Sequence, residues 1–100
     1  MWWLLRQAGL RPQSNVEFRD DFGQPGRMDF AFPECGLAIE ADGFESHGER
    51  EAFERDRVRN ARLAALGWRI VPVTWRQLDE QPKQVLQRIH EALRYRTVPV

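Results

Sequence analysis

The segment from residue 37 to residue 75 constrains the fold most, because a helix-like stretch separates two strand-like stretches. Residues 49–66 contain no glycine or proline, consist of strong helix formers and end before Gly67, which predicts a helix. The apolar runs 37–42 and 68–75 on either side are predicted as strands. Strand–helix–strand connections are almost always right-handed, so the two strands should be parallel.

The residues before this unit predict an incomplete helix and further strands. Residues 1–9 resemble the end of a helix that Gly9 terminates. Residues 15–21 are typical of a polar outer strand, and the glycines and proline within 23–26 predict a turn. The period-2 alternation of Met28, Phe30 and Phe32 predicts a strand that forms a hairpin across 27–42. Asp29 should then point away from those three residues.

The last part of the chain completes an α/β pattern. Pro72 lacks a backbone donor, so its strand should lie at a sheet edge or carry a bulge. Residues 82–95 predict an amphipathic helix whose apolar stripe contains Val85, Leu86, Ile89 and Leu93. The predicted order is helix, three strands, helix, strand, helix. We therefore expect one domain over residues 1–100, with a mixed sheet and helices on its faces.

Composition narrows the function only slightly. Fifteen basic and fifteen acidic residues cancel, so net charge gives no support to nucleic-acid binding. The lone Cys35 excludes an internal disulfide and suits a reducing compartment. No apolar run reaches the roughly 20 residues of a membrane span. We expect a cytoplasmic protein without a membrane segment.

Acidic residues gather on the predicted central strands. Ala38, Glu40 and Asp42 share one face of their strand, and Asp29 lies one hairpin crossing away. Buried carboxylates close together are costly and raise each other's pKa, and a divalent cation relieves both effects. The alternative interpretation is a solvated acidic face.

Two residues after the strand extend this hypothesis. Gly43 permits a sharp turn or a close approach of the backbone to a ligand, although an ordinary strand end explains it equally. Because histidine side chains in general change charge near neutral pH, His47 becomes a candidate general acid or base beside carboxylates. A solvent-exposed loop histidine is the alternative.

The long helix adds polar residues to an apolar stripe. Phe53 and Leu63 should be buried, and Asp56 and Asn60 fall on the same stripe. Arg59 either pairs with Asp56 within the helix or one of the two reaches the acidic site. The remaining arginines of the helix, including Arg62, are predicted to form a solvated face with one edge available to phosphates.

The run from Arg27 to Trp75 resembles the domain-of-unknown-function 559 family, which is related to the very-short-patch-repair endonucleases of the PD-(D/E)XK superfamily. The resemblance rests on Asp29, the run Glu40-Ala41-Asp42-Gly43, His47, the pair Asp56 and Arg59, and Gly67-Trp68-Arg69. It implies a restriction-endonuclease-like αβββαβα core and a metal-dependent DNA endonuclease, with roles in DNA repair among its relatives.

The resemblance also implies a role for each site residue. Asp29, Asp42 and the Ala41 carbonyl would hold Mg²⁺, with Mn²⁺ as a substitute, and Glu40 would be a ligand or its supporting partner. His47 would transfer the proton. Asp56, Arg59 and Gly43 would support the site or bind nucleic acid. DNA is the implied partner, no small-molecule cofactor is implied, and a homodimer would allow both strands to be cut.

This sequence departs from the superfamily pattern in two ways. Asp42 stands where a lysine is usual, and His47 is the natural substitute. Relatives usually begin with a longer helix that carries a glutamate, so we expect either a truncated start or an incomplete first helix in this sequence. A second function class therefore stays open, namely a non-catalytic nucleic-acid-binding or antitoxin-like regulatory module that retains the nuclease fold.

Overall fold

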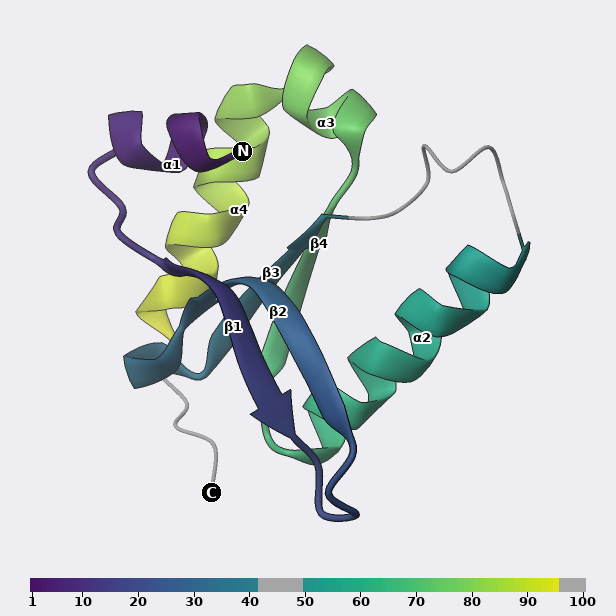
Figure 1. Ribbon diagram of the computed structural model, residues 1–100. Helices are drawn as coiled ribbons and strands as arrows, with labels where there is room; N and C mark the ends of the chain where they lie inside the picture. The colour runs from purple at the N-terminus through teal and green to yellow at the C-terminus, as the bar shows by residue number, and fades with distance from the viewer. Residues whose placement is uncertain (42–49, 96–100) are drawn as a thin grey trace.

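The structure, a computed structural model, describes residues 1–41 and 50–95, without the side chains of residues 50–53 and 56. These residues form a mixed α/β fold whose four-stranded sheet carries helices on its faces (Figure 1). The elements are α1 (Trp2–Gln7), β1 (Gln13–Arg19), β2 (Pro25–Phe32), the 3-10 turn η1 (Pro33–Cys35), β3 (Leu37–Ala41), α2 (Arg50–Ala65), β4 (Arg69–Val73), α3 (Trp75–Glu80) and α4 (Pro82–Arg94). The order matches the predicted αβββαβα core, with α3 as an addition.

Strand β3 occupies an interior position in the sheet order β1-β2-β3-β4. It pairs antiparallel with β2 and parallel with β4. The parallel pairing confirms the prediction made from the strand–helix–strand order. Pro72 lies on β4 at the edge of this sheet, as a residue without an N–H group requires.

The sheet buries apolar side chains on both faces. On the face covered by α1 and α4 the buried residues are Leu5, Phe32, Cys35, Leu37, Ile39, Val71, Val73, Val85 and Ile89. On the face covered by α2 they are Met28, Ala31, Ala38 and Leu63 (Figure 1). Burial of Val85 and Ile89 confirms the apolar stripe predicted for the last helix. On α2, burial of Leu63 confirms that part of the predicted stripe, and the Phe53 side chain lies outside the described residues. None of the helices within the described ranges is long and apolar enough to cross a membrane.

Helix α1 is fastened to β2 through aromatic packing. The ring of Trp2 stacks on Phe30 at a centroid distance of 6.0 Å, and the Arg6 guanidinium lies 5.9 Å from the Trp2 ring centroid. Leu5 inserts fully into the core beneath the helix. These contacts hold a helix of six residues, which would be unstable alone.

The first hairpin differs from its predicted boundaries. Strand β1 spans Gln13–Arg19 rather than 15–21, because the Asp20 carboxylate accepts hydrogen bonds from the amides of Phe22 and Gln24 and starts the turn there. Pro25, predicted in the turn, is already in β2 and pairs with Arg19.

The predicted strand 68–75 is also shorter, because α3 begins within it. Thr74 accepts a hydrogen bond from the Gln77 amide, and the Gln77 side chain accepts one from the Thr74 amide. This capping box ends β4 at Val73. Sequence reasoning missed this additional helix, although the Thr-x-x-Gln spacing of a capping box predicts its start.

The alternation predicted for β2 is wrong at Met28. Phe30 and Phe32 pack on the α1 and α4 face, whereas Met28 packs on the α2 face with Ala31. The β1–β2 ladder skips the pair formed by residues 15 and 29, and Asn15 has a left-handed φ of 51° at this point. The break in the regular pleat accompanies the change of face.

Candidate active site

Glu40 is a buried acid on the strand inside the sheet. It lies two residues after Ala38 on the α2 face of β3, as predicted from the strand period. Its side chain is only 1% exposed, and it is the one buried charged residue within the described ranges. Neither carboxylate oxygen has a well-formed hydrogen bond to a described residue. Such an acid needs a cation nearby or a proton of its own.

Asp29 lies on β2 next to this acid. The β2–β3 register pairs Phe30 with Ile39, so residue 29 comes level with residue 40 one step further. The Asp29 carboxylate oxygen Oδ2 accepts a hydrogen bond of 2.8 Å from the Ala41 amide. The sequence prediction that Asp29 and Glu40 converge across the hairpin is therefore confirmed.

Arg59 approaches the acids from helix α2. Its Nη2 atom lies 3.2 Å from Glu40 Oε2, and its side chain is 25% exposed. This contact confirms that Arg59 reaches the acidic site, whereas its pairing with Asp56, whose side chain lies outside the described residues, stays a prediction. Asn60 interrupts the buried side of the helix as expected, and its Oδ1 atom is buried without a hydrogen bond to a described residue.

The surroundings of Glu40 perturb its protonation strongly. Burial is the largest cause and raises the pKa of Glu40 from 4.5 to about 8. The Arg59 charge opposes this rise, and the Asp29 charge adds to it. Near neutral pH the Glu40 carboxyl therefore holds a proton, unless a cation of higher charge than Arg59 binds beside it.

Several predicted site residues lie outside the described residues. Asp42, Gly43 and His47 belong to this group, and the side chain of Asp56 is not described either. Ala41 ends β3 and is exposed, with its amide bound to Asp29. Among residues 1–41 and 50–95, no three histidine, cysteine, aspartate or glutamate side chains are grouped to hold a metal ion. The predicted ligand set, which needs Asp42, stays a prediction.

A groove of about 480 Å³ opens beside Asp29 and Arg59. Its remaining lining residues come from the first hairpin and are Glu17, Pro25, Gly26 and Arg27. Sequence reasoning missed Arg27 as a site residue. Period-2 spacing gave no signal for Arg27, because the regular pleat of β2 is broken between Met28 and Asp29.

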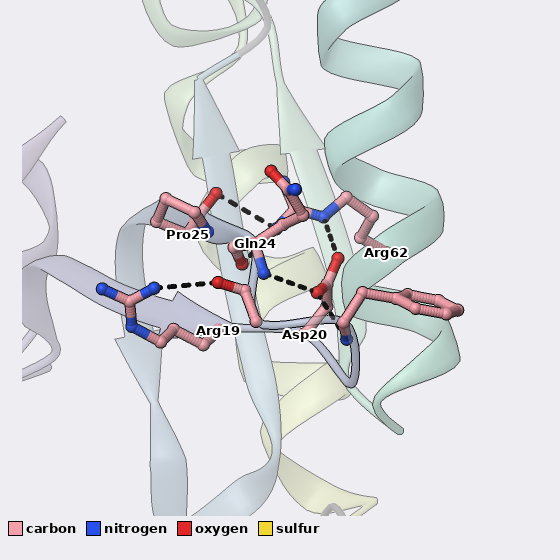
Figure 2. Close-up of polar contacts among 7 residues, drawn as sticks. Arg19, Asp20, Gln24, Pro25 and Arg62 are labelled. Atoms are coloured by element: carbon pink, nitrogen blue, oxygen red, sulfur yellow. Dashed lines mark hydrogen bonds and ion pairs between the residues drawn. The ribbon is translucent and has the colours of Figure 1, made fainter.

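The first hairpin is clamped to α2 by Arg62 (Figure 2). The Arg62 Nε atom donates to Asp20 Oδ2 at 2.9 Å, and Nη2 donates to the carbonyls of Gln24 and Pro25 at 2.6 and 3.0 Å. The guanidinium also lies 5.2 Å from the Phe18 ring centroid. Arg62 is thus a structural anchor, and its assignment to a solvated face was wrong.

Asp20 is stabilised as an anion within this clamp. Desolvation raises its pKa, but hydrogen bonds from the Gln24 and Phe22 amides and from Arg62 outweigh that effect. The net pKa of Asp20 is lower than its ordinary value. The charged clamp therefore fixes the position of the hairpin relative to the helix that carries Arg59.

Comparison with known proteins identifies the class to which this arrangement belongs. An αβββαβα order with acids on adjacent strands fits restriction-endonuclease-like proteins. The model of the restriction-endonuclease-like family REase_MTES_1575 matches residues 3–93, and the chain belongs to this family.

Two curated relatives come from Mycobacterium tuberculosis. They are Uncharacterized protein MT2308 of strain CDC 1551 / Oshkosh and Uncharacterized protein Rv2248 of strain ATCC 25618 / H37Rv. Each is 37% identical over 78 residues, which is 78% of this chain and 29% of the relative. The chain thus matches less than a third of the length of either relative. No solved structure gives a significant match.

Proposed function

We propose that this domain is a metal-dependent DNA endonuclease that hydrolyses phosphodiester bonds. The observation that carries the proposal is Glu40, a buried acid without a well-formed hydrogen bond, beside Asp29 on the neighbouring strand. Membership of a restriction-endonuclease-like family supports the same chemistry and implies DNA as the partner.

The described residues fit a hard divalent cation. Asp29 and Glu40 bring two carboxylates to adjacent positions on β2 and β3, with Asp29 Oδ2 bound to the Ala41 amide, and both oxygens of Glu40 lack well-formed hydrogen bonds to described residues. Carboxylate oxygens are the ligands that Mg²⁺ prefers, and Mn²⁺ accepts the same donors. Asp42 and the Ala41 carbonyl, directly after Glu40, complete the proposed ligand set.

Each residue has a distinct role in the proposed hydrolysis. A bound Mg²⁺ supplies Lewis-acid activation of the phosphodiester and of the attacking water. Asp29, Glu40 and Asp42 hold the cation. Arg59 contacts a non-bridging phosphate oxygen and stabilises the charge that develops there.

The proton transfer and the finer classification follow from the sequence resemblance. His47 is the proposed proton-transfer group, and Gly43 lets the chain turn close to the substrate. Asp56 supports Arg59 from the same helix. We place the domain with very-short-patch-repair-like endonucleases of the domain-of-unknown-function 559 type, acting in DNA repair, and two copies would cut the two strands.

Calorimetry and cleavage assays together test the proposal. Wild-type protein should bind Mg²⁺ and Mn²⁺, and Asp42→Ala should not. Wild-type protein should nick or cut plasmid DNA only when the cation is present, with Asp79→Ala on α3 as an exposed acidic control. Metal binding equal in wild type and Asp42→Ala, or cleavage that persists in EDTA, would reject the proposed site.

The neutral net charge favours a second candidate function. In that case the domain is a non-catalytic nucleic-acid-binding or antitoxin-like module. DNA binding that persists in EDTA, with no cleavage in Mg²⁺ or Mn²⁺, would select it.

A further inference from the structure

The groove beside Asp29 continues along the first hairpin. A second hollow of about 240 Å³ is lined by Glu17, Phe18, Arg19 and Pro25. It shares Glu17 and Pro25 with the groove that contains Asp29 and Arg59. The two hollows therefore adjoin at Glu17 and Pro25, and we call them together the hairpin track, which extends from the candidate active site toward the β1–β2 turn.

Arginines occur at intervals along the hairpin track. Arg59 stands at the active-site end, Arg27 in the middle and Arg19 toward the turn. Asp29, Arg27 and Pro25 follow one another along β2 and all line the groove. Arg19 is the ladder partner of Pro25. Several arginines along the same track can each bind one charge of a polyanion with repeated phosphates, whereas a small anion would contact only one of them.

The walls of the track are held in place before any ligand binds. Arg62 joins the turn to α2 through Asp20, Gln24 and Pro25 (Figure 2). On β1, Arg19 Nη1 donates to the Gly23 carbonyl at 2.8 Å. A preformed surface loses little conformational entropy when a ligand binds, so this preorganisation favours binding at the track.

A close backbone approach shapes the middle of the track. Gly26 lies directly against the Phe18 ring, and a Cβ atom at this position would collide with it. The glycine thus lets the ring pack beneath the path. Arg27, the next residue, is exposed and forms no ion pair with a described residue, so its guanidinium is available to a ligand.

We propose that the hairpin track binds the sugar-phosphate backbone of the DNA strand on one side of the scissile phosphate. Arg27 contacts the first phosphate beyond the active site, and Arg19 contacts the next one toward the turn. The inference rests on the proposed nuclease function, because the scissile phosphate fixes one end of the path at Asp29 and Arg59.

Glu17 places a negative charge within the hairpin track. Glu17 faces Arg27 across the β1–β2 ladder and lines both hollows. Its carboxylate repels a phosphate in the same path. Removal of this charge should therefore strengthen DNA binding, whereas removal of Arg27 should weaken it.

Fluorescence anisotropy with a short labelled duplex tests the track. Binding is measured in Ca²⁺ and in EDTA, over salt from about 50 to 200 mM, with gels to confirm that the DNA stays intact. Arg27→Ala should weaken binding severalfold and reduce the slope of log affinity against log salt by about 1. Glu17→Gln should tighten binding. Arg88→Ala, an exposed arginine on α4, is the matched control and should match wild type.

The outcomes separate the track from the nuclease proposal. Two duplexes of unrelated sequence should lose equal affinity in Arg27→Ala, because phosphate contacts carry no sequence information. The proposed role of the track is rejected if Arg27→Ala loses affinity for only one of the two duplexes, or if its affinity equals that of Arg88→Ala. Either result would count even if the wild-type protein cleaves DNA. If wild type fails to cleave in Mg²⁺ or Mn²⁺ while the Arg27 and Glu17 effects persist, the nuclease proposal fails and the track stands.

Discussion

Arg59 on α2 places its guanidinium 3.2 Å from the buried carboxylate of Glu40 on β3. The contact connects the sheet to the helix at the point where the candidate acids converge. The Arg59 charge favours the ionised form of Glu40, against the burial that favours its protonated form. In the proposed mechanism the same guanidinium, which also lines the adjoining groove, would contact the phosphate.

Replacement of Asp29 by asparagine should abolish cleavage without unfolding the protein. The amide oxygen can still accept the hydrogen bond from Ala41, but the charge that holds a cation is lost. Plasmid cleavage and circular dichroism provide the two measurements. Asp79→Asn on α3 is the control, and wild-type cleavage by Asp29→Asn would contradict the assignment.

The pH dependence of stability should report the protonation of Glu40. Its pKa in the folded protein, about 8, lies above the ordinary value of 4.5. Between these values the folded state holds a proton that the unfolded state has lost. The contribution of the Glu40 proton to the free energy of unfolding is therefore fully present below pH 4.5. It is lost as the pH rises from 4.5 through 8.

Denaturant unfolding in EDTA at pH 5 and pH 8 measures this effect. Each unit of pKa difference corresponds to about 1.4 kcal/mol, so the free energy of unfolding should fall clearly over this interval. Glu40→Gln should remove most of the fall, whereas Glu34→Gln, at an exposed position, should keep it. An equal fall in both variants would assign the dependence to other groups.

Arg59→Ala should reduce cleavage by roughly a hundredfold or more, because one preorganised donor to developing charge has an effect of this size. Single-turnover kinetics in saturating Mg²⁺ measure the loss. Arg55→Ala on the exposed side of the same helix is the matched control. If both variants retain the wild-type rate, Arg59 has no role in the reaction.

Arg62→Ala should lower the free energy of unfolding by about 2 kcal/mol or more, because three hydrogen bonds from one charged group are lost. Arg62→Lys should fall between wild type and alanine, since an ammonium cannot reproduce the planar fork. Denaturant unfolding provides the measurement, again with Arg55→Ala for comparison. No difference between Arg62→Ala and Arg55→Ala would show that the clamp does not contribute to stability.

Periodic patterns predicted much of this fold. The alternation along 37–42 and the glycine-free helix that follows located β3 and α2, and their order predicted the parallel pairing with β4. The convergence of Asp29 and Glu40 followed from hairpin spacing. These features depend on local geometry, which the sequence contains directly.

Contacts between distant segments were less accessible. Arg59 and Arg62 lie one turn apart on α2, yet one contacts the buried acid and the other clamps a turn 38 to 42 residues away. Their roles depend on how the helix docks on the sheet, which a one-dimensional pattern does not determine. The change of face at Met28 likewise depends on the unusual backbone of Asn15.

Pro72 on β4 has a consequence for association between copies of the chain. An outermost strand normally offers a row of amide donors to any passing strand, and the ring of an exposed proline interrupts that row. Continuous sheet extension from one molecule to the next is therefore disfavoured along this side. Two copies that act together on a duplex would have to meet through β1 at the opposite edge of the sheet, or through helices or loops.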